Sequence, residues 1–559
     1  LDTYHERTRE VVLAHLDGSA LRCLHAELAT HLEAVADPEP ELLARLFRGA
    51  GDLSRARHYA ALAARAAQSR AQFEHAAALF HLAAELSTHE AAGFHLERGD
   101  ALARAGRSRA AAEAYLAART GSDGDTIIGL HARAALHLLT AGHLEHGRQV
   151  LAEGFTLAGL MPAATSVRGR LAALWRRGQM AVRGLQWSER SHGAQHRGAL
   201  VRVDLLHAAA MASMATDMAA AADIQAQHLL LALQAGDPHR VGRALVLDAG
   251  LAAHIGPSGR GRSDALLAEA RALATRLGDV RLGFWIDLFE LAVDGLGADL
   301  AATLRRVETL ARADDGGLAL PHTRAMIQFY GVRALFKQGR WLEVGERIPN
   351  LLAAAIERDD RCAQVWLRAF HVWMQLARND LDAARGDLDG AQQAWPHPLT
   401  QGYHLQHLQI AVARTALRLY TGDATGAWQT MQAEAPHFAR SGVAQAQALR
   451  ILFTDLQART AVAAWRQQPG DLTMRRTAVR GVDDLQRLGA RGLASLLRAS
   501  LNPESADELL RAAAAEFTAR GQAIHHAAAL LRLREPAGAA SFRTHGIADP
   551  ERLAAVFAP

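Results

Sequence analysis

Seven short turns, each centred on a glycine or an asparagine, divide most of the chain into paired helical segments. The centres of these turns are Gly51, Gly106, Gly142, Gly236, Gly339, Asn379 and Gly422. A glycine or asparagine just past a helix supplies the left-handed backbone that ends it, and an Asp or Ser beside it caps the following helix. The sequence therefore predicts a series of helix–turn–helix units.

A second regularity follows each turn. Five residues after the turn centre the chain has a small residue at five of the seven turns, and a valine at the other two. These residues are Ala56, Ala111, Gly147, Ala384 and Ala427, with Val241 and Val344 as the exceptions. A small side chain at this place lets the second helix of a pair approach the first closely.

The composition agrees with helices. The chain is rich in Ala and Leu, has only 15 Pro among 559 residues, and contains 5% aromatic residues. Ala, Leu, Arg and Glu favour helices, whereas the β-branched and aromatic residues that favour strands are scarce. We therefore expect an all-α protein.

The apolar residues also repeat at helical spacing. One stripe runs through Ala325, Phe329, Val332 and Phe336, and a second begins after Gly339, so residues 325–355 form a helical hairpin. The segment 365–376 has apolar stripes on two sides, as a helix inside a stacked array requires. The turns are spaced less regularly than the 34 residues of a strict tetratricopeptide repeat. The pattern predicts an irregular tetratricopeptide-like α-solenoid, a superhelix of antiparallel helix pairs.

Three parts are expected along the chain. Residues 1–37 form a short helical unit that ends before Pro38, residues 38–535 form the solenoid, and residues 536–559 form a terminal segment. We expect two interruptions, an Arg-rich stretch over 161–202 and a glycine-rich turn at 256–263 whose Ser263 caps the next helix. Because the chain begins at Leu1 without an initiator Met or a signal peptide, we interpret it as part of a longer protein.

The sequence contains no recognisable catalytic or cofactor motif. The glycine-rich GPSGRGRS has arginine where a phosphate-binding loop has lysine, and no GxSxG or protein-kinase signature occurs. The 28 histidines include the close pairs His143/His146, His404/His407, His89/His95 and His525/His526, but no HExxH. Such isolated pairs are more often solvated or capping than metal ligands. We expect no enzymatic activity, no cofactor and no metal in this chain.

Charge, cysteine content and hydropathy indicate which partners and which cellular compartment to expect. The net charge of +4 is small for this length and gives no support to nucleic acid binding, and 61 of the 62 basic residues are Arg because Lys337 is the single lysine. Cys23 and Cys362 form neither a disulfide framework nor a metal pair, which fits a reducing compartment. No stretch is apolar enough for a membrane span. We expect a cytoplasmic protein.

One stretch has a distinctive charge pattern. Between residues 161 and 202 many arginines surround a single acid, Glu189, and two tryptophans lie among them. The candidate partner-binding residues are Arg168, Arg170, Arg176, Arg177, Arg183, Trp175 and Trp187. Arginine forks suit phosphates, carboxylates or an acidic protein surface. The alternative is a solvated helix face whose arginines pair with acids elsewhere in the array.

Several segments resemble one family. YHERTREVV (4–12) resembles a helix that closes the winged-helix region of large bacterial signal-transducing ATPases, with Glu6 in place of the usual Asp and Thr8 in place of an aliphatic residue. LWRRGQMAVRGLQWSER (174–190), QAQHLLLALQAGDPHRVGRAL (225–245), GRGRS (259–263) and THGIADPERLAAVFAP (544–559) are similar to the C-terminal helical region of multidomain bacterial serine/threonine protein kinases.

The resemblance implies a function. Those kinases carry an N-terminal kinase domain, a central AAA-type ATPase module and a tetratricopeptide-like C-terminal region, so ATP and Mg²⁺ are expected only in upstream modules. On this basis the chain is a non-catalytic sensor and scaffold region that binds a protein or small effector on its concave surface and regulates the upstream modules, with residues 1–36 transmitting the change. The alternative is a protein-interaction scaffold or oligomerisation arm of a receptor-type ATPase without small-molecule sensing.

Overall fold

The computed structural model describes residues 17–35, 38–87, 89–161, 175–176, 178–179, 182–190, 194–214, 217–296, 299–314, 317 and 319–559. In these ranges every regular element is a helix and no strand occurs, which confirms the all-α prediction. None of the helices in this part of the chain is both long enough and apolar enough to cross a lipid bilayer. The YHERTREVV segment and most of 161–174 lie outside the described residues.

The chain divides into two compact units after Leu138. The first unit contains α2 (Gly18–Glu33), α3 (Pro40–Ala50), α4 (Leu53–Ser69), α5 (Phe73–Glu85), α6 (Ala91–Ala105), α7 (Ser108–Ala117) and most of α8 (Gly124–Thr140). From α2 to α7, each helix packs against the next one along the chain. The contacts of α4 show why they approach closely, because all of its buried residues are alanines.

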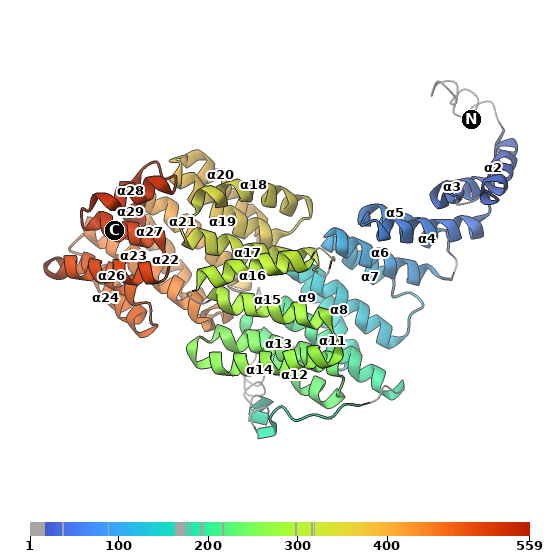
Figure 1. Cartoon of the computed structure of the whole chain (residues 1–559), viewed down its shortest axis with the longest axis horizontal. Coiled ribbons are helices and arrows are strands. Elements are labelled where there is room, and N and C mark those ends of the chain that lie inside the picture. The colour runs from blue at the N-terminus through green and yellow to red at the C-terminus, as the bar shows by residue number, and fades with distance from the viewer. Residues whose placement is uncertain are drawn as a thin grey trace. The chain divides into compact units, whose positions relative to one another are not determined.

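The second unit continues the same pattern from Leu139 to Pro559. Its first helices are α9 (Leu144–Ala158), α11 (Ala194–Met214), α12 (Met218–Ala235), α13 (Pro238–His254), α14 (Pro257–Leu277), α15 (Val280–Leu296), α16 (Leu300–Ala313), α17 (Pro321–Lys337), α18 (Trp341–Glu357), α19 (Arg361–Ala377) and α20 (Leu381–Ala394). Figure 1 shows α13, α15 and α17 side by side, and contacts between α13 and α15 and between α15 and α17 agree with that view.

The remaining helices complete the second unit. They are η2 (Leu399–Gln401), α21 (Leu405–Tyr420), α22 (Ala424–Arg440), η3 (Gly442–Gln445), α23 (Gln447–Gln467), α24 (Leu472–Arg487), α25 (Arg491–Leu501), η4 (Pro503–Ser505), α26 (Ala506–Ala519), α27 (Ala523–Arg532), α28 (Pro536–Thr544) and α29 (Pro550–Phe557). The segment 536–559 forms the last two of these helices, and α29 packs on both α21 and α27.

The turns behave as the sequence predicts. All seven turn centres have a left-handed backbone with φ between 59° and 91°. At four turns the following aspartate caps the next helix, with its carboxylate accepting a backbone N–H at 2.8–3.0 Å: Asp52, Asp237, Asp380 and Asp423. At the other three turns the cap position holds Arg107, His143 or Arg340, so the expected Asp or Ser cap is absent there.

The close-approach positions are also confirmed. Every one of the seven residues found five places after a turn is buried, the two valines included. Helix α19 is buried along both of its stripes, with Val365 and Val372 fully covered on one side and Trp366 and Trp373 on the other. It contacts α18, α20 and α21, as a helix with neighbours on several sides does.

The prediction for residues 256–263 is wrong. The helix begins at Pro257 rather than near Ser263, and Ser263 is fully buried inside it instead of capping it. Glycine at 259 fits here because α14 crosses α13 closely: a Cβ on Gly259 would lie 1.9 Å from the Ala252 carbonyl oxygen. Gly259 therefore serves helix contact, whereas the sequence suggested a turn.

A buried ion pair connects the C-terminal helix to the interior. Arg459 and Asp455, one turn apart on α23, pair with each other, and each side chain is about 95% covered. Arg459 also donates to the Val556 carbonyl oxygen at 3.4 Å and lies 5.3 Å from the centre of the Phe557 ring. Burial raises the pKa of Asp455 although Arg459 acts in the opposite direction. These contacts place α29 on α23.

Two glycines of α14 provide a matched pair of variants. Gly259→Ala is expected to lower the free energy of unfolding by about 1–3 kcal/mol, because its methyl group overlaps α13. Gly261→Ala is expected to raise it by up to about 1 kcal/mol, because nothing lies within 4 Å of the added carbon and alanine favours helix. Urea unfolding of both variants measures the difference. Equal effects would contradict the close crossing.

Candidate functional site

The structure describes only part of the predicted arginine site. Arg168, Arg170 and Arg177 lie outside the described residues. Arg176 pairs with the buried Asp223 of α12, with Nη2 2.5 Å from Oδ1, so this arginine joins two segments of the array. Arg183 is exposed and donates to the Leu230 carbonyl oxygen at 3.4 Å.

The other members of this stretch are also placed along the surface of the helices. Trp175 is 65% exposed, whereas Trp187 is partly buried. Glu189, the single acid of the stretch, pairs with Arg276 at 2.9 Å. Among the described members, Arg176 pairs with an acid of another helix, whereas Arg183 and Trp175 are exposed. Neither of the two pockets described below includes any of them.

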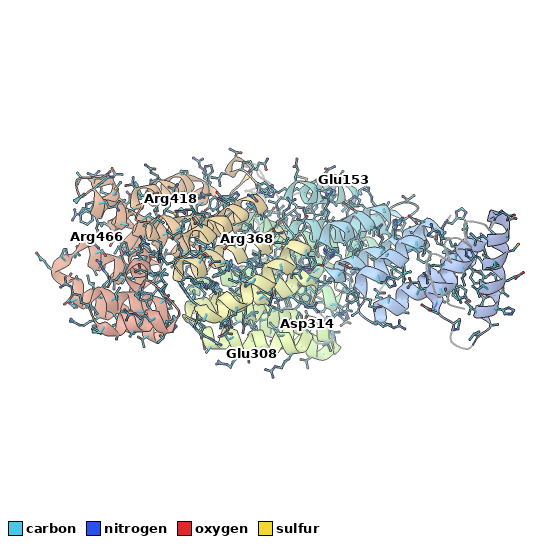
Figure 2. All side chains as sticks on the ribbon, turned by 90° about the horizontal axis from the view of Figure 1, so that it is seen from above. Glu153, Glu308, Asp314, Arg368, Arg418 and Arg466 are labelled. Atoms are coloured by element: carbon cyan, nitrogen blue, oxygen red, sulfur yellow. The ribbon has the colours of Figure 1, made fainter. Side chains whose placement is uncertain are left out.

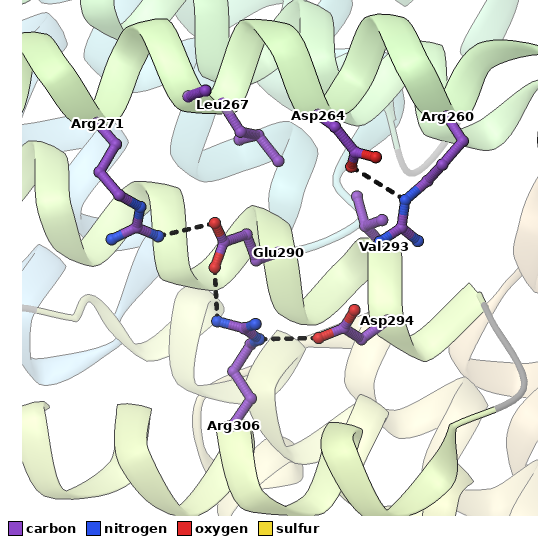
Figure 3. Close-up of a pocket in the computed structure, with 9 residues that line it drawn as sticks. Arg260, Asp264, Leu267, Arg271, Glu290, Val293, Asp294 and Arg306 are labelled. Carbon is purple, nitrogen blue, oxygen red and sulfur yellow. Dashed lines mark hydrogen bonds and ion pairs between the residues drawn. The ribbon is translucent and has the colours of Figure 1, made fainter.

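The first pocket lies between α14, α15 and α16 and has a volume of about 360 Å³. Figure 3 shows that its charged side chains are directed at one another. Arg271 and Arg306 both bind the carboxylate of Glu290, at 2.7 and 2.6 Å, and Arg306 also binds Asp294 at 2.9 Å. Arg260 pairs with Asp264 at 3.0 Å. Any ligand would have to displace these ion pairs, so we interpret the pocket as a structural network between three helices.

The second pocket, the arginine pocket, lies among the C-terminal helices and has a volume of about 680 Å³. Its lining residues are Arg466, Leu531, Arg532, Arg534, Glu535, Pro536, Ala539, Glu551, Ala554, Ala555 and Ala558. Arg466 is the last residue but one of α23, and Figure 2 labels it on the C-terminal helices. This volume lies in the range of small-molecule sites.

A sharp reversal between α27 and α28 positions two of the arginines. Arg534 has a left-handed backbone with φ of 60°, and its N–H binds the Leu531 carbonyl oxygen at 2.9 Å. The next residue, Glu535, binds the Leu530 carbonyl oxygen, and Pro536 then starts α28. Gly538 allows the two helices to meet, because a Cβ there would lie 2.5 Å from the Leu531 nitrogen.

The charges in the arginine pocket are not balanced by ion pairs. Within the described part of the chain, Arg466, Arg532 and Arg534 form no ion pair with a carboxylate, unlike the arginines of the first pocket. Burial lowers the pKa of Arg532, and the charge of Arg466 lowers it further. The two guanidinium groups therefore lie near each other, in a pocket whose lining also includes Glu535 and Glu551.

The chemistry of the arginine pocket suits an anion. Its lining combines these charged side chains with small apolar ones, of which Ala554 and Ala558 are buried. Glu535 precedes the first turn of α28 and Glu551 lies in the first turn of α29, where helix dipoles favour negative charge. The three guanidinium groups remain to bind carboxylate or phosphate oxygens, which they match in geometry.

The histidine pair at 404 and 407 belongs to a buried cluster with Trp395 and His397. The rings of His404 and His407 stack at 5.2 Å, and both flank Trp395. His407 Nδ1 accepts the His404 backbone N–H at 3.0 Å and its Nε2 donates to the His397 carbonyl oxygen at 2.8 Å. Arg148 of α9 donates to His404 Nε2 at 3.1 Å. These ring nitrogens are therefore used for packing α9 on α21.

Over the described ranges, no three His, Cys, Asp or Glu side chains are grouped as a metal ion would require. Cys23 and Cys362 are both free thiols, and burial raises the pKa of Cys362.

Comparison with protein-family models and with curated proteins finds no match for this chain. The resemblance to the C-terminal region of bacterial kinases therefore remains a prediction from the quoted segments.

The sequence reasoning missed the arginine pocket. Arg466 precedes Arg532 by 66 residues in the sequence, and only Arg532 and Arg534, close to Glu535–Pro536, form a local pattern. A helix end followed by a proline indicates that the chain reverses direction and begins a new helix, but nothing in the sequence shows that Arg466 lies beside this reversal.

The pKa of His404, lowered to about 3 by burial and by the neighbouring His407 and Arg148, predicts pH-dependent stability. An unfolded histidine titrates near 6.5, so the unfolded chain binds more protons below that pH and stability falls as the pH drops from 6.5 toward 3. His404→Gln keeps an acceptor for Arg148 and removes this proton uptake. Relative to wild type, the variant is expected to gain about 2 kcal/mol between pH 7.5 and pH 5.

Chemical unfolding at the two pH values measures this gain. His146→Gln, a change at an exposed position of α9, is the matched control and should show no comparable gain. An equal pH response of wild type and His404→Gln would contradict the neutral state of His404.

Proposed function

We propose that this chain is a helical-repeat binding module with a tetratricopeptide-like solenoid arrangement. The support is the order of contacts in the second unit, where neighbouring helices pack in sequence and alternate helices such as α19 and α21 or α23 and α25 also touch. In a stack of helix pairs each helix contacts its sequence neighbours and the equivalent helix of the next pair. Hydrophobic clusters between successive helices, one over α15–α17 and one over α21–α23, agree with this arrangement.

The module acts as a sensor that binds an anionic effector in the arginine pocket. The single observation that carries this proposal is the set of three arginines without carboxylate partners around a cavity of about 680 Å³. Arg466, Arg532 and Arg534 are exposed residues. Clustered cations favour a bound counter-charge, and bidentate guanidinium contacts give orientation as well as affinity. A pure protein-interaction scaffold needs no such cavity.

The effector would regulate upstream modules of a longer signalling protein in the cytoplasm, an AAA-type ATPase and a serine/threonine kinase. This part of the proposal rests on the resemblance of the segments 174–190, 225–245 and 544–559 to kinase-linked helical regions. Effector binding shifts the parent protein between its inactive and active states only to the extent that the effector binds one state more tightly than the other.

Binding is tested with citrate and with inorganic pyrophosphate as probes. Isothermal titration of the wild-type chain is compared with Arg466→Gln and Arg532→Gln, which each remove one guanidinium group. Each change is expected to weaken binding at least about tenfold, because a charge-assisted hydrogen bond contributes about 1.5–3 kcal/mol. Arg476→Gln, on the exposed face of α24, is the control and should bind like wild type. Unchanged affinity in the pocket variants would contradict the site.

Regulation is tested separately. The chain is added to the upstream kinase and ATPase part of its parent protein, and phosphoryl transfer is measured with and without the probe anion. Regulation predicts a change in rate that Arg466→Gln abolishes. A rate that is the same with and without the chain would count against regulation and favour the scaffold alternative.

A further inference from the structure

The helix α29 lies against helices that alternate along the chain. Helices α19, α21, α23 and α25 contact one another in series, and α29 contacts both α21 and α27. Figure 1 shows α29 among α21, α23 and α27, which agrees with these contacts. In a stack of helix pairs, the helices that alternate along the chain line one surface of the stack. Residues 548–559, the α29 segment, therefore cover part of such a surface.

Each of the five alternate helices from α19 to α27 provides a side chain that contacts the α29 segment. These residues form the alternate-helix surface: Trp373 of α19, Tyr420 of α21, Arg459 of α23, Ser500 of α25 and His525 of α27. Three of them meet at Phe557, whose ring stacks on the Trp373 ring with 5.2 Å between ring centres. The same ring lies 4.9 Å from the His525 ring and 5.3 Å from the Arg459 guanidinium carbon. Phe557 is therefore the aromatic anchor of the segment.

Backbone hydrogen bonds fix both ends of the α29 segment. At its start the Ala548 N–H donates to the carbonyl oxygen of Ala377, the last residue of α19, at 2.7 Å. At its other end the Ser500 hydroxyl donates to the Pro559 carbonyl oxygen at 2.6 Å. The alternate-helix surface therefore determines the register of the segment as well as its position.

The buried face of α29 has the spacing of a helix that lies in a groove. Its buried residues include Pro550, Leu553, Ala554 and Phe557, at positions i, i+3, i+4 and i+7. An amphipathic helix that binds in the groove of another protein has its anchors at this spacing. The segment thus contacts the alternate-helix surface in the way that a separate helix would.

The surface under α29 contains buried charges, which a purely structural contact does not need. Arg459 and Asp455 form an ion pair there, and each side chain is about 95% covered. Within the described residues, Asp455 Oδ1 and Arg459 Nε are buried without a hydrogen-bond partner. Burial raises the pKa of Asp455 and lowers the pKa of His525 to about 3. Release of α29 would return water to these groups, and this gain offsets part of the apolar contact that is lost.

We propose that the α29 segment is a releasable internal ligand, and that the alternate-helix surface beneath it is the binding site of a helix from a partner protein. The partner helix presents an aromatic side chain to Trp373 and Arg459, as Phe557 does. It presents an aliphatic side chain one turn earlier, at the place of Leu553. Its binding displaces α29, so the segment inhibits the site as long as it stays in place.

The arginine pocket shares a wall with this site. Glu551, Ala554, Ala555 and Ala558 of the α29 segment line that pocket, so release of α29 removes one of its walls. The inference rests on the stacked helices of the proposed module and does not need its anion. Partner binding is therefore measured without citrate, pyrophosphate or phosphate, and a failure of the anion site leaves the result unaffected.

The probe is a fluorescein-labelled peptide with the sequence of residues 548–559, which is added to the complete chain. In wild type the resident α29 competes with it, so the apparent affinity is reduced by the small fraction of molecules in which the surface is open. Phe557→Ala in the chain weakens the resident helix. Fluorescence anisotropy is expected to show at least tenfold tighter peptide binding to this variant than to wild type.

Matched controls exist in the chain and in the peptide. Leu472→Ala removes an exposed apolar side chain of α24 and should leave peptide binding as in wild type. A peptide with Phe557→Ala should bind at least tenfold more weakly to the open variant, because it lacks the aromatic anchor. A peptide with Ala555→Ser, a change at an exposed position of α29, should bind like the parent peptide.

Hydrogen–deuterium exchange of the unmodified chain gives a second measurement that needs no variant. Backbone amides of α29 are expected to exchange at least tenfold faster than those of α19, α21 and α23, because a releasable helix opens locally. Equal protection of α29 and α23 would overturn the inference. So would a Phe557→Ala chain that binds the peptide no more tightly than wild type. A wild-type dimer that the peptide dissociates would assign the surface to the α29 of a second copy and overturn the separate partner.

Discussion

Close helix contact is the constraint on which the rest of this structure depends. Alanine and glycine occupy the positions where helices meet, as in α4, whose buried face is alanine throughout, and at Gly259, where α13 and α14 cross. Small side chains bury little apolar surface each, but they bring backbones together so that many weak contacts add up. Each turn then needs a residue with a left-handed backbone, because the next helix begins directly after the turn.

The chain accommodates its charged side chains in three ways. The arginines of the first pocket all pair with acids, as Arg306 does with Glu290 and Asp294. Imidazoles such as His404 stay neutral and join helices through hydrogen bonds. Within the described residues, the three arginines of the arginine pocket form a cluster without carboxylate partners.

The sequence predicted the local features well because they depend on local chemistry. The left-handed turns at Gly51 and Asn379, the aspartate caps after them and the two buried stripes of α19 follow from residues close together. The prediction failed where a contact between distant segments determines the local structure. The sequence around Gly259 suggested a turn, but Gly259 lies inside α14, where this helix crosses α13. The arginine pocket was missed for the same reason, because Arg466 and Arg532 are brought together only by the packing of α23 on the C-terminal helices.

The central claim is that an anion binds at the reversal between α27 and α28. Hydrogen–deuterium exchange of the complete chain with and without citrate tests it most directly, since exchange reports local opening residue by residue. The account predicts slower exchange in residues 530–540 and at the end of α23, with little change in α14–α16, where every charge of the pocket is already paired. Protection confined to α14–α16, or no protection anywhere at saturating citrate, would contradict it.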